Sequence, residues 1–293
     1  MELDDLRKRL VARCEALRGR AGFFLWIPSR GVGLGHREDE RFPTASTIKT
    51  GVMVAAMRAV DRGELDLTST HPVPPASGRQ PSMWSYWFRD GVTLDLDGWV
   101  NLMITVSDNT ATMVVRDWLG TMAVNRELAS LGLSQTMILG NAPPEETEVQ
   151  ALRRQFGMGV STPREMTALM TMILEGRAAS PAACDRMARI LSHQYWDDYL
   201  GAGLPLEVKV ASKSGAIGRS RSDAAIVYGP EPFVLSVYTD GLVDQRWTLD
   251  NEGVVMIREV SALVWNALNP DRPAVLPEGW ERFAPTGGGV EDS

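Results

Sequence analysis

Apolar positions recur at helical spacing at the start of the chain and then become continuous. Five of them share one face of an amphipathic helix: Leu3, Leu6, Leu10, Cys14 and Leu17. The apolar run Phe23–Ile27 predicts a buried strand, and the glycine-rich stretch 31–35 predicts a turn leading to a second strand. From about residue 43 to 191 the pattern is mostly helical. Thr162 and Ser180, each followed by proline, predict two helix starts, with Glu165 closing a capping box on Thr162.

The last third of the chain alternates between apolar and polar residues, which is typical of strands. Three strands are expected, over Glu207–Ser212, Asp223–Tyr228 and Phe233–Thr239. A long helix follows, with a buried stripe formed by Ile257, Val260, Val264 and Leu268. Residues 269–293 are rich in proline and glycine and are predicted to form a tail.

This order of elements predicts an α+β fold. We expect an antiparallel sheet flanked by the N- and C-terminal helices, with an all-helical lobe inserted between its strands. Residues 1–268 would form one catalytic domain of two lobes. The α/β lobe comprises 1–42 and 205–268, and the helical lobe comprises 43–204.

Composition narrows the class of protein. The 293 residues are 44% hydrophobic and 23% charged, as in ordinary globular proteins. The net charge of −7 gives no electrostatic footprint for nucleic acid, and no apolar run approaches the roughly 18 residues of a membrane span. Two cysteines exclude a disulfide scaffold. The first residues contain no apolar signal core, which favours the cytoplasm; a removed leader would instead place the protein in the periplasm or outside the cell.

Lysine is rare in this chain. Only four of the 30 lysine and arginine residues are lysine. Two of them, Lys49 and Lys213, lie in segments whose neighbouring residues include candidate catalytic serines. Arginine stays protonated, whereas a buried lysine can lose its proton and act as a base.

The first such segment is Ser46-Thr47-Ile48-Lys49, directly before an apolar helical run. Thr44 is expected to cap this helix, so Ser46 falls in the first turn, near the positive end of the helix dipole. Lys49, three residues on, would lie on the same face within reach of the Ser46 oxygen. Apolar neighbours would lower the pKa of its amine and activate the serine as a nucleophile. By itself a Ser-x-x-Lys spacing is weak evidence, because a chain of this length is expected to contain about one by chance.

Two further segments complete the pattern. Ser107-Asp108-Asn109 separates two helical stretches, so it can present Ser107 and Asn109 to a cleft or simply cap the second helix. Lys213-Ser214-Gly215 ends a predicted strand and offers a cation, a hydroxyl and a glycine that permits close approach.

The three segments in this order resemble those of the class A β-lactamases and penicillin-binding proteins. The resemblance implies that Ser46 attacks a carbonyl and forms an acyl-enzyme, with Lys49 taking its proton directly or through water. Ser107 would pass a proton to the leaving nitrogen, and Asn109 would hold an amide of the substrate.

The same resemblance assigns the remaining binding residues. Lys213 and Ser214 would dock a substrate carboxylate, and the backbone N–H groups of Ser46 and Ala216 would form the oxyanion hole. Arg219 or Arg221 could assist the carboxylate, with Arg221 preferred because it is nearer to the next strand. No metal or other cofactor is expected, and the partner would be a small-molecule substrate.

The chain departs from this family at the loop that activates the deacylating water. Glu146-x-x-Val149-Gln150 has the spacing of the family's Glu-x-x-Leu-Asn loop. The aspartate that clamps this loop in the family is Gly159 here. Glu146 is therefore the candidate deacylating residue, with a solvated loop as the alternative.

Three functions follow from these features. The first is a serine hydrolase that opens β-lactam rings. The second is a D-alanyl peptidase, esterase or thioesterase on the same scaffold, with slow or no β-lactam turnover. The third is a catalytically silent binding module, against which the four retained motif residues Ser46, Lys49, Ser107 and Lys213 argue. An aromatic cluster at 84–88 could line the cleft or belong to the core.

Overall fold

The computed structural model describes residues 2–82 and 84–274, so the predicted tail lies outside the described residues beyond 274. The helices are α1 (Leu3–Glu15), α2 (Lys49–Asp61), α3 (Leu96–Thr105), α4 (Asn109–Leu119), α5 (Thr121–Ser130), α6 (Thr147–Phe156), α7 (Pro163–Leu174), α8 (Pro181–Leu191) and α9 (Glu252–Leu268). The strands are β1 (Arg20–Ile27), β2 (Val32–His36), β3 (Phe42–Pro43), β4 (Thr70–Pro72), β5 (Thr93–Asp95), β6 (Met137–Ile138), β7 (Gly159–Ser161), β8 (Lys209–Ile217), β9 (Ser220–Tyr228) and β10 (Phe233–Asp240).

Five strands form one antiparallel sheet in the order β2-β1-β10-β9-β8. Its register aligns a row of residues across the whole sheet. Phe24 pairs with Ser236, Ser236 with Ala224, and Ala224 with Lys213 on the outer strand β8. The pairing therefore places Lys213 on the edge strand, beside the helical part of the molecule.

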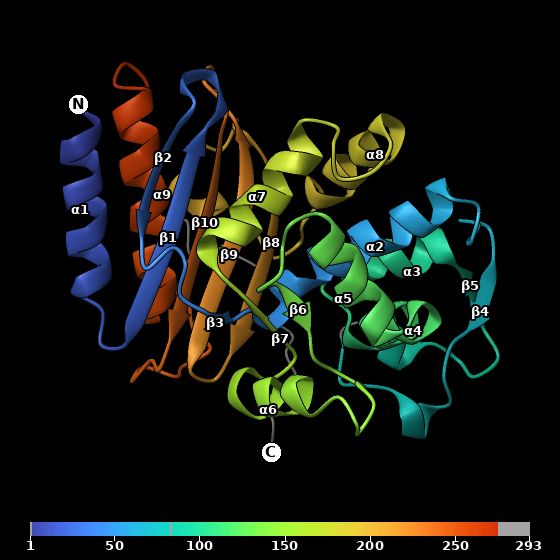
Figure 1. The fold of residues 1–293 in the computed structure, drawn as a ribbon. Coiled ribbons are helices and arrows are strands. Elements are labelled where there is room, and N and C mark those ends of the chain that lie inside the picture. The colour runs from blue at the N-terminus through green and yellow to red at the C-terminus, as the bar shows by residue number, and fades with distance from the viewer. Residues whose placement is uncertain (1, 83, 275–293) are drawn as a thin grey trace.

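Helices cover both faces of this sheet (Figure 1). Helices α1 and α9 pack together on one face, and α7 packs on the other against β1, β9 and β10. The stripe residues Leu6 and Leu10 of α1 are fully buried, as are Val260 and Val264 of α9. The predicted terminal helices and their apolar faces are thus confirmed, and with them the α+β class.

Helix α2 runs through the centre of the helical part (Figure 1). Every residue from Lys49 to Met57 is buried, which is expected of a helix that is apolar on all sides. It contacts α3, α4, α5 and α8, and their shared core continues to Ala224 and Ile226 on the sheet. Lys49, the first residue of α2, is therefore buried in the interior of the protein.

Several local expectations are corrected by the structure. Gly33 and Gly35 lie inside β2 rather than in a turn, and the region expected to be all helical also contains β4, β5, β6 and β7. These strands are two or three residues long, too short to show a period in the sequence. Thr162 and Ser180 cap α7 and α8 as predicted. Glu165 does not close the capping box, because its carboxylate accepts hydrogen bonds from residues 135 and 136.

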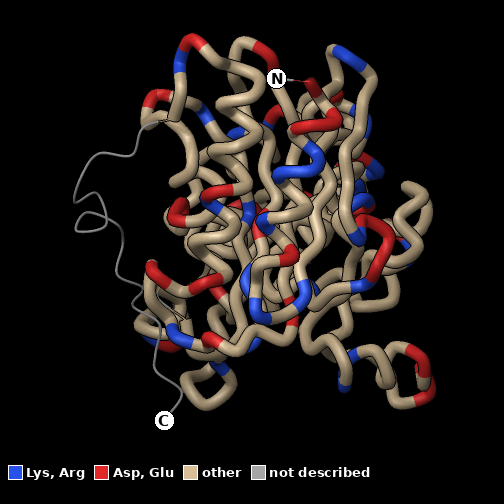
Figure 2. The backbone as a smooth tube through the Cα atoms, turned by 90° about the vertical axis from the view of Figure 1, so that its left-hand side faces the viewer, with Lys and Arg blue, Asp and Glu red and all other residues tan. Residues whose placement is uncertain are grey.

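Basic and acidic residues are interspersed along the backbone in the view of Figure 2. Many arginines are paired, such as Arg246 with Asp244 and Asp250. Among the described residues, none of the helices has the length and apolar character to cross a membrane. Within the same part of the chain, no group of three or more His, Cys, Asp or Glu side chains is arranged to hold a metal ion.

Candidate active site

Ser46 lies in a short 3-10 turn, Ala45–Ile48, that leads directly into α2. The capping role expected for Thr44 is wrong, since its hydroxyl donates to the Ala45 carbonyl and accepts no N–H of the turn. Ala45 has φ +45°, a left-handed conformation that is uncommon for a residue other than glycine. Such strain is typical of functional sites, and here it immediately precedes the predicted nucleophile.

Lys49 is fully buried, and its amine contacts the second motif segment. Nζ donates to the Ser107 carbonyl at 2.6 Å, to Ser107 Oγ at 3.1 Å and to Asn109 Oδ1 at 2.9 Å. Three acceptors match the three hydrogens of an ammonium group. Among the described residues, none of the amine's hydrogen bonds goes to Ser46 Oγ, so the direct contact expected from the spacing is not formed in this state.

The surroundings of Lys49 lower the pKa of its amine. Burial is the largest cause and lowers the pKa of Lys49 well below its usual range, and the positive charge of Lys213 lowers it further. The negative charge of Asp108 and the three oxygen acceptors act in the opposite direction. A neutral amine keeps two hydrogens and presents a lone pair, so it can release one oxygen and accept a proton.

The Ser107 turn is held in a strained conformation by its neighbour. Ser107 has φ +58°. Asp108 is fully buried and caps α4 by accepting from Ala111 N, and the same carboxylate accepts from the backbone and hydroxyl of Ser85. The capping interpretation of this segment is therefore confirmed for Asp108, and Ser107 and Asn109 on either side of it reach Lys49.

The third segment packs directly on the 3-10 turn Ala45–Ile48, here called the nucleophile turn after the predicted role of Ser46. A Cβ atom on Gly215 would lie 2.5 Å from the Thr44 carbonyl oxygen and 2.9 Å from Ser46 N. Only glycine permits this approach of β8. Lys213 is fully buried and donates to the Ser214 carbonyl at 2.9 Å; burial lowers its pKa, while Asp223 and Asp198 raise it.

The remaining predicted binding residues differ in their surroundings. Ser214 is buried and Ala216 half-buried on the end of β8. Arg221 is fully buried, and its guanidinium donates to backbone carbonyls, including those of Ile217, Ser220 and Arg246. In this structure Arg221 holds the β8–β9 hairpin together, and its burial leaves little of the guanidinium accessible for the predicted carboxylate contact.

Glu146 directly precedes α6, and its side chain is half-buried. Within the described part of the chain, no hydrogen bond or ion pair fixes its carboxylate. Gln150 donates to the Ala142 carbonyl at 2.7 Å, so the loop is held mainly by local contacts. At the position of the missing clamp, a Cβ on Gly159 would lie 2.6 Å from Thr44 Oγ1, so the glycine lets β7 pack against the nucleophile turn.

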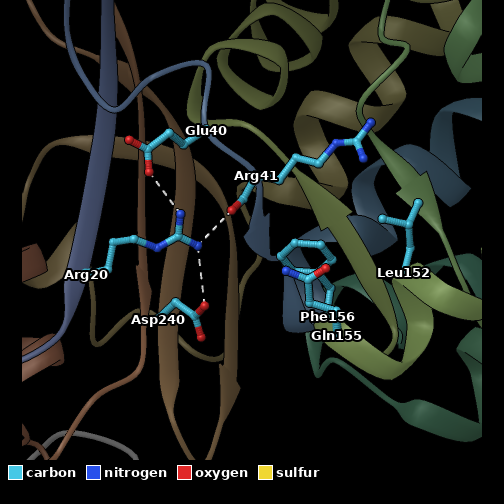
Figure 3. A pocket seen from close by; sticks show the side chains of 7 residues that line it. All are labelled: Arg20, Glu40, Arg41, Leu152, Gln155, Phe156 and Asp240. Carbon is cyan, nitrogen blue, oxygen red and sulfur yellow. Dashed lines mark hydrogen bonds and ion pairs between the residues drawn. The ribbon is translucent and has the colours of Figure 1, made fainter.

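A cavity of about 590 Å³ lies between α6 and the end of the sheet (Figure 3). Arg20 spans one wall and donates to Glu40, to the Arg41 carbonyl and to Asp240. Its lining includes none of the motif residues, and its charged groups mostly satisfy one another. The aromatic residues Trp84 and Trp87 are exposed, so they are not part of the core.

Sequence reasoning missed the residues that hold these segments together. Gly215 was expected to give room to a substrate, but its immediate neighbour is the backbone of Ser46. The carboxylate of Asp108 links the turn to residue 85, a contact that no spacing in the sequence indicates. Motif order was the signal for the site as a whole.

Known proteins resemble this chain over most of its length. Beta-lactamase L2 of Stenotrophomonas maltophilia is 29% identical over 234 residues, covering 76% of this chain and 74% of that protein. A β-lactamase structure from Sphaerobacter thermophilus matches with TM-score 0.79 and 29% identity, covering 92% and 99% of the two chains. A variant of PBP-A, solved as its acyl-enzyme complex with penicillin G, matches with TM-score 0.80 and 28% identity over 92% and 97%. The profile of the Beta-lactamase enzyme family matches residues 4–268, and the chain belongs to that family of serine hydrolases.

Proposed function

We propose that this protein opens the amide bond of a β-lactam ring through an acyl-enzyme on Ser46. The observation that carries the proposal is the buried amine of Lys49, which bonds to Ser107 and Asn109 while the Gly215 strand packs on Ser46 N. Three segments far apart in sequence thereby supply a nucleophile, a base and a proton carrier at one place.

The residues divide the first half of the reaction between them. Neutral Lys49 releases one of its oxygen partners and takes the proton as Ser46 Oγ bonds to the carbonyl carbon. Backbone N–H groups of Ser46 and Ala216 stabilise the developing oxyanion. The C–N bond breaks as Ser107 gives a proton to the ring nitrogen, and Lys49 returns one to Ser107.

Further residues of the same site would contact the substrate. Lys213 and Ser214 would bind the substrate carboxylate, and the exposed Asn109 has one Nδ2 hydrogen left beside its bond to the Pro81 carbonyl. In the second half of the reaction, Glu146 would activate the water that hydrolyses the ester.

A second candidate is a D-alanyl peptidase, esterase or thioesterase that acylates with β-lactams but releases them slowly. The unanchored Glu146 carboxylate and the glycine at 159 favour it, as does the similarity to PBP-A. The silent binding module is disfavoured by the strained turn at Ser107 and its hydrogen bonds to the buried Lys49, because a scaffold alone does not need this arrangement.

One time course separates these functions. The protein is mixed with a fluorescent penicillin, and the mass of the intact chain is followed over time. We expect a transient adduct that is absent in Ser46→Ala. A long-lived adduct supports the second candidate. No adduct, together with no hydrolysis of an activated ester, would leave only the binding module.

A further inference from the structure

The segment that connects α8 to β8 contacts both motif-bearing parts of the site. Residues 194–200, here called the brace, lie about 90 positions after the Ser107 turn in sequence. Tyr195 N donates to the Thr105 carbonyl at 2.8 Å, and Trp196 Nε1 donates to the Val106 carbonyl at 3.0 Å. The side chain of Gln194 donates to the Ile104 carbonyl at 3.1 Å. The brace thus bonds three consecutive carbonyls.

These carbonyls form the C-terminal end of α3. The last carbonyls of a helix have no donor within the helix and must find one elsewhere. Here the brace supplies the donors, and the next residue is Ser107, with φ +58°. The brace therefore fixes Thr105 and Val106, the two residues directly before the strained Ser107.

The same side-chain amide reaches the sheet. Gln194 Nε2 also donates to the Ser212 carbonyl at 3.3 Å, one residue before Lys213. Its Oε1 accepts from Trp196 N at 3.3 Å. Two N–H donors and one acceptor are all in use, so the amide is locked between α3 and β8.

The far end of the brace is anchored independently. Leu200 N donates at 3.0 Å to Asp223, a fully buried residue that stands opposite Ser214 in the β8–β9 pairing. Arg258 of α9 donates to the Asp198 carbonyl at 2.7 Å. The brace is therefore tied to β8, β9 and α9 as well as to α3.

We propose that the brace fixes the Ser107 turn relative to Lys213, and that Gln194 and Trp196 are positioning residues for acylation. The inference rests on the proposed function, because positioning matters only if Ser107 and Lys213 act on one substrate. A displacement of about 1 Å at reacting groups costs on the order of 100-fold in rate. Loss of a single brace contact is expected to cost about tenfold, because the other contacts remain.

The test compares two adjacent aromatic residues of the brace. Trp196→Phe removes the indole N–H together with the five-membered part of the ring, and Tyr195→Phe removes a hydroxyl that the brace does not use. We expect Trp196→Phe to slow adduct formation about tenfold with little change in substrate affinity, and Tyr195→Phe to leave it unchanged. Gln194→Glu, which turns an oxygen toward two carbonyls, should slow it more, with Gln135→Met as the control outside the brace.

Two further readouts distinguish positioning from general stability. The acidic limb of acylation should move to higher pH in Trp196→Phe, because a loosened turn lets water reach Lys49. Amide hydrogen exchange should rise at residues 105–109 and 212–215, and this readout needs no substrate. Normal acylation rates together with normal hydrogen exchange in folded Trp196→Phe and Gln194→Glu would overturn the proposed positioning role of the brace. Failure of the unmodified protein to form an adduct would instead overturn the proposed function. Hydrogen exchange would still show whether the brace fixes the Ser107 turn.

Discussion

The predicted acylation residues Lys49 and Ser107 and the predicted deacylation residue Glu146 are held in place in different ways. Lys49 and Ser107 are bonded to each other, and their surroundings come from α2, α3, α4 and β8. Glu146 lies at the start of α6 in a loop that is bonded mainly to itself. Helix α6 packs Val149, Leu152 and Phe156 into a small apolar cluster, and Arg219 donates to the Gln155 carbonyl at the end of the helix far from Glu146.

This difference indicates which of the two chemical steps, formation or hydrolysis of the acyl-enzyme, the fold supports better. A group that is bonded to several elements keeps its position without further cost when substrate binds, whereas a carboxylate without donors must be ordered first. The architecture therefore supports forming the acyl-enzyme more strongly than removing it. Changes to the first half should have large effects, and changes at Glu146 small ones.

The largest effect is expected for Lys49→Arg. Arginine keeps the positive charge but cannot lose a proton, so the base is removed. We expect acylation to fall by about 1,000-fold, within the range for loss of a general base. Stopped-flow measurement of adduct formation checks this. Lys209→Arg, at a lysine that lies over the ring of Tyr228, is the matched control and should be normal. Normal acylation by Lys49→Arg would exclude Lys49 as the base.

Gly215→Ala is expected to have the next largest effect. Its methyl group would collide with the backbone at Thr44 and Ser46, so β8 must move away from the nucleophile turn. Acylation should fall by roughly 100-fold. The control is Gly218→Ala, where the nearest atom is a flexible side-chain oxygen at 3.5 Å. Equal rates for both variants in the same labelling assay would show that the close approach is not needed.

The same contacts show how far the sequence predicts this site. Periodicity was sufficient to find α1, α9 and the long strands, because their apolar faces repeat over many residues. It did not give all their ends, since β8 continues past the predicted Ser212 to Ile217 and β9 begins at Ser220 rather than Asp223. Motif order predicted which segments meet. The partners of Lys49 could not be predicted, since a spacing of three residues places Ser46 and Lys49 on one face but does not say where the amine points. Contacts across the chain, such as Asp108 with Ser85, follow only from tertiary packing.

The pH dependence of acylation should reflect Lys49. Because burial lowers its pKa, the neutral amine forms at a lower pH than for an exposed lysine. Below that pKa the rate should rise about tenfold per pH unit, and above it the rate should level off. Lys213→Met removes a positive charge that disfavours protonated Lys49, so the limb should shift to higher pH. A flat profile in both proteins would contradict a lysine base.

The smallest effect is expected for Glu146→Gln. A positioned general base contributes roughly 100- to 10,000-fold, but a carboxylate that no donor orients supplies only a small part of this. We therefore expect adduct loss to slow by less than about tenfold, with adduct formation unchanged, as followed by intact mass. Glu145→Gln, at the exposed neighbour, should alter neither rate. If Glu146→Gln instead stops release completely, the loop must become ordered in the acyl-enzyme, and the two halves of the site are equally well built once substrate is bound.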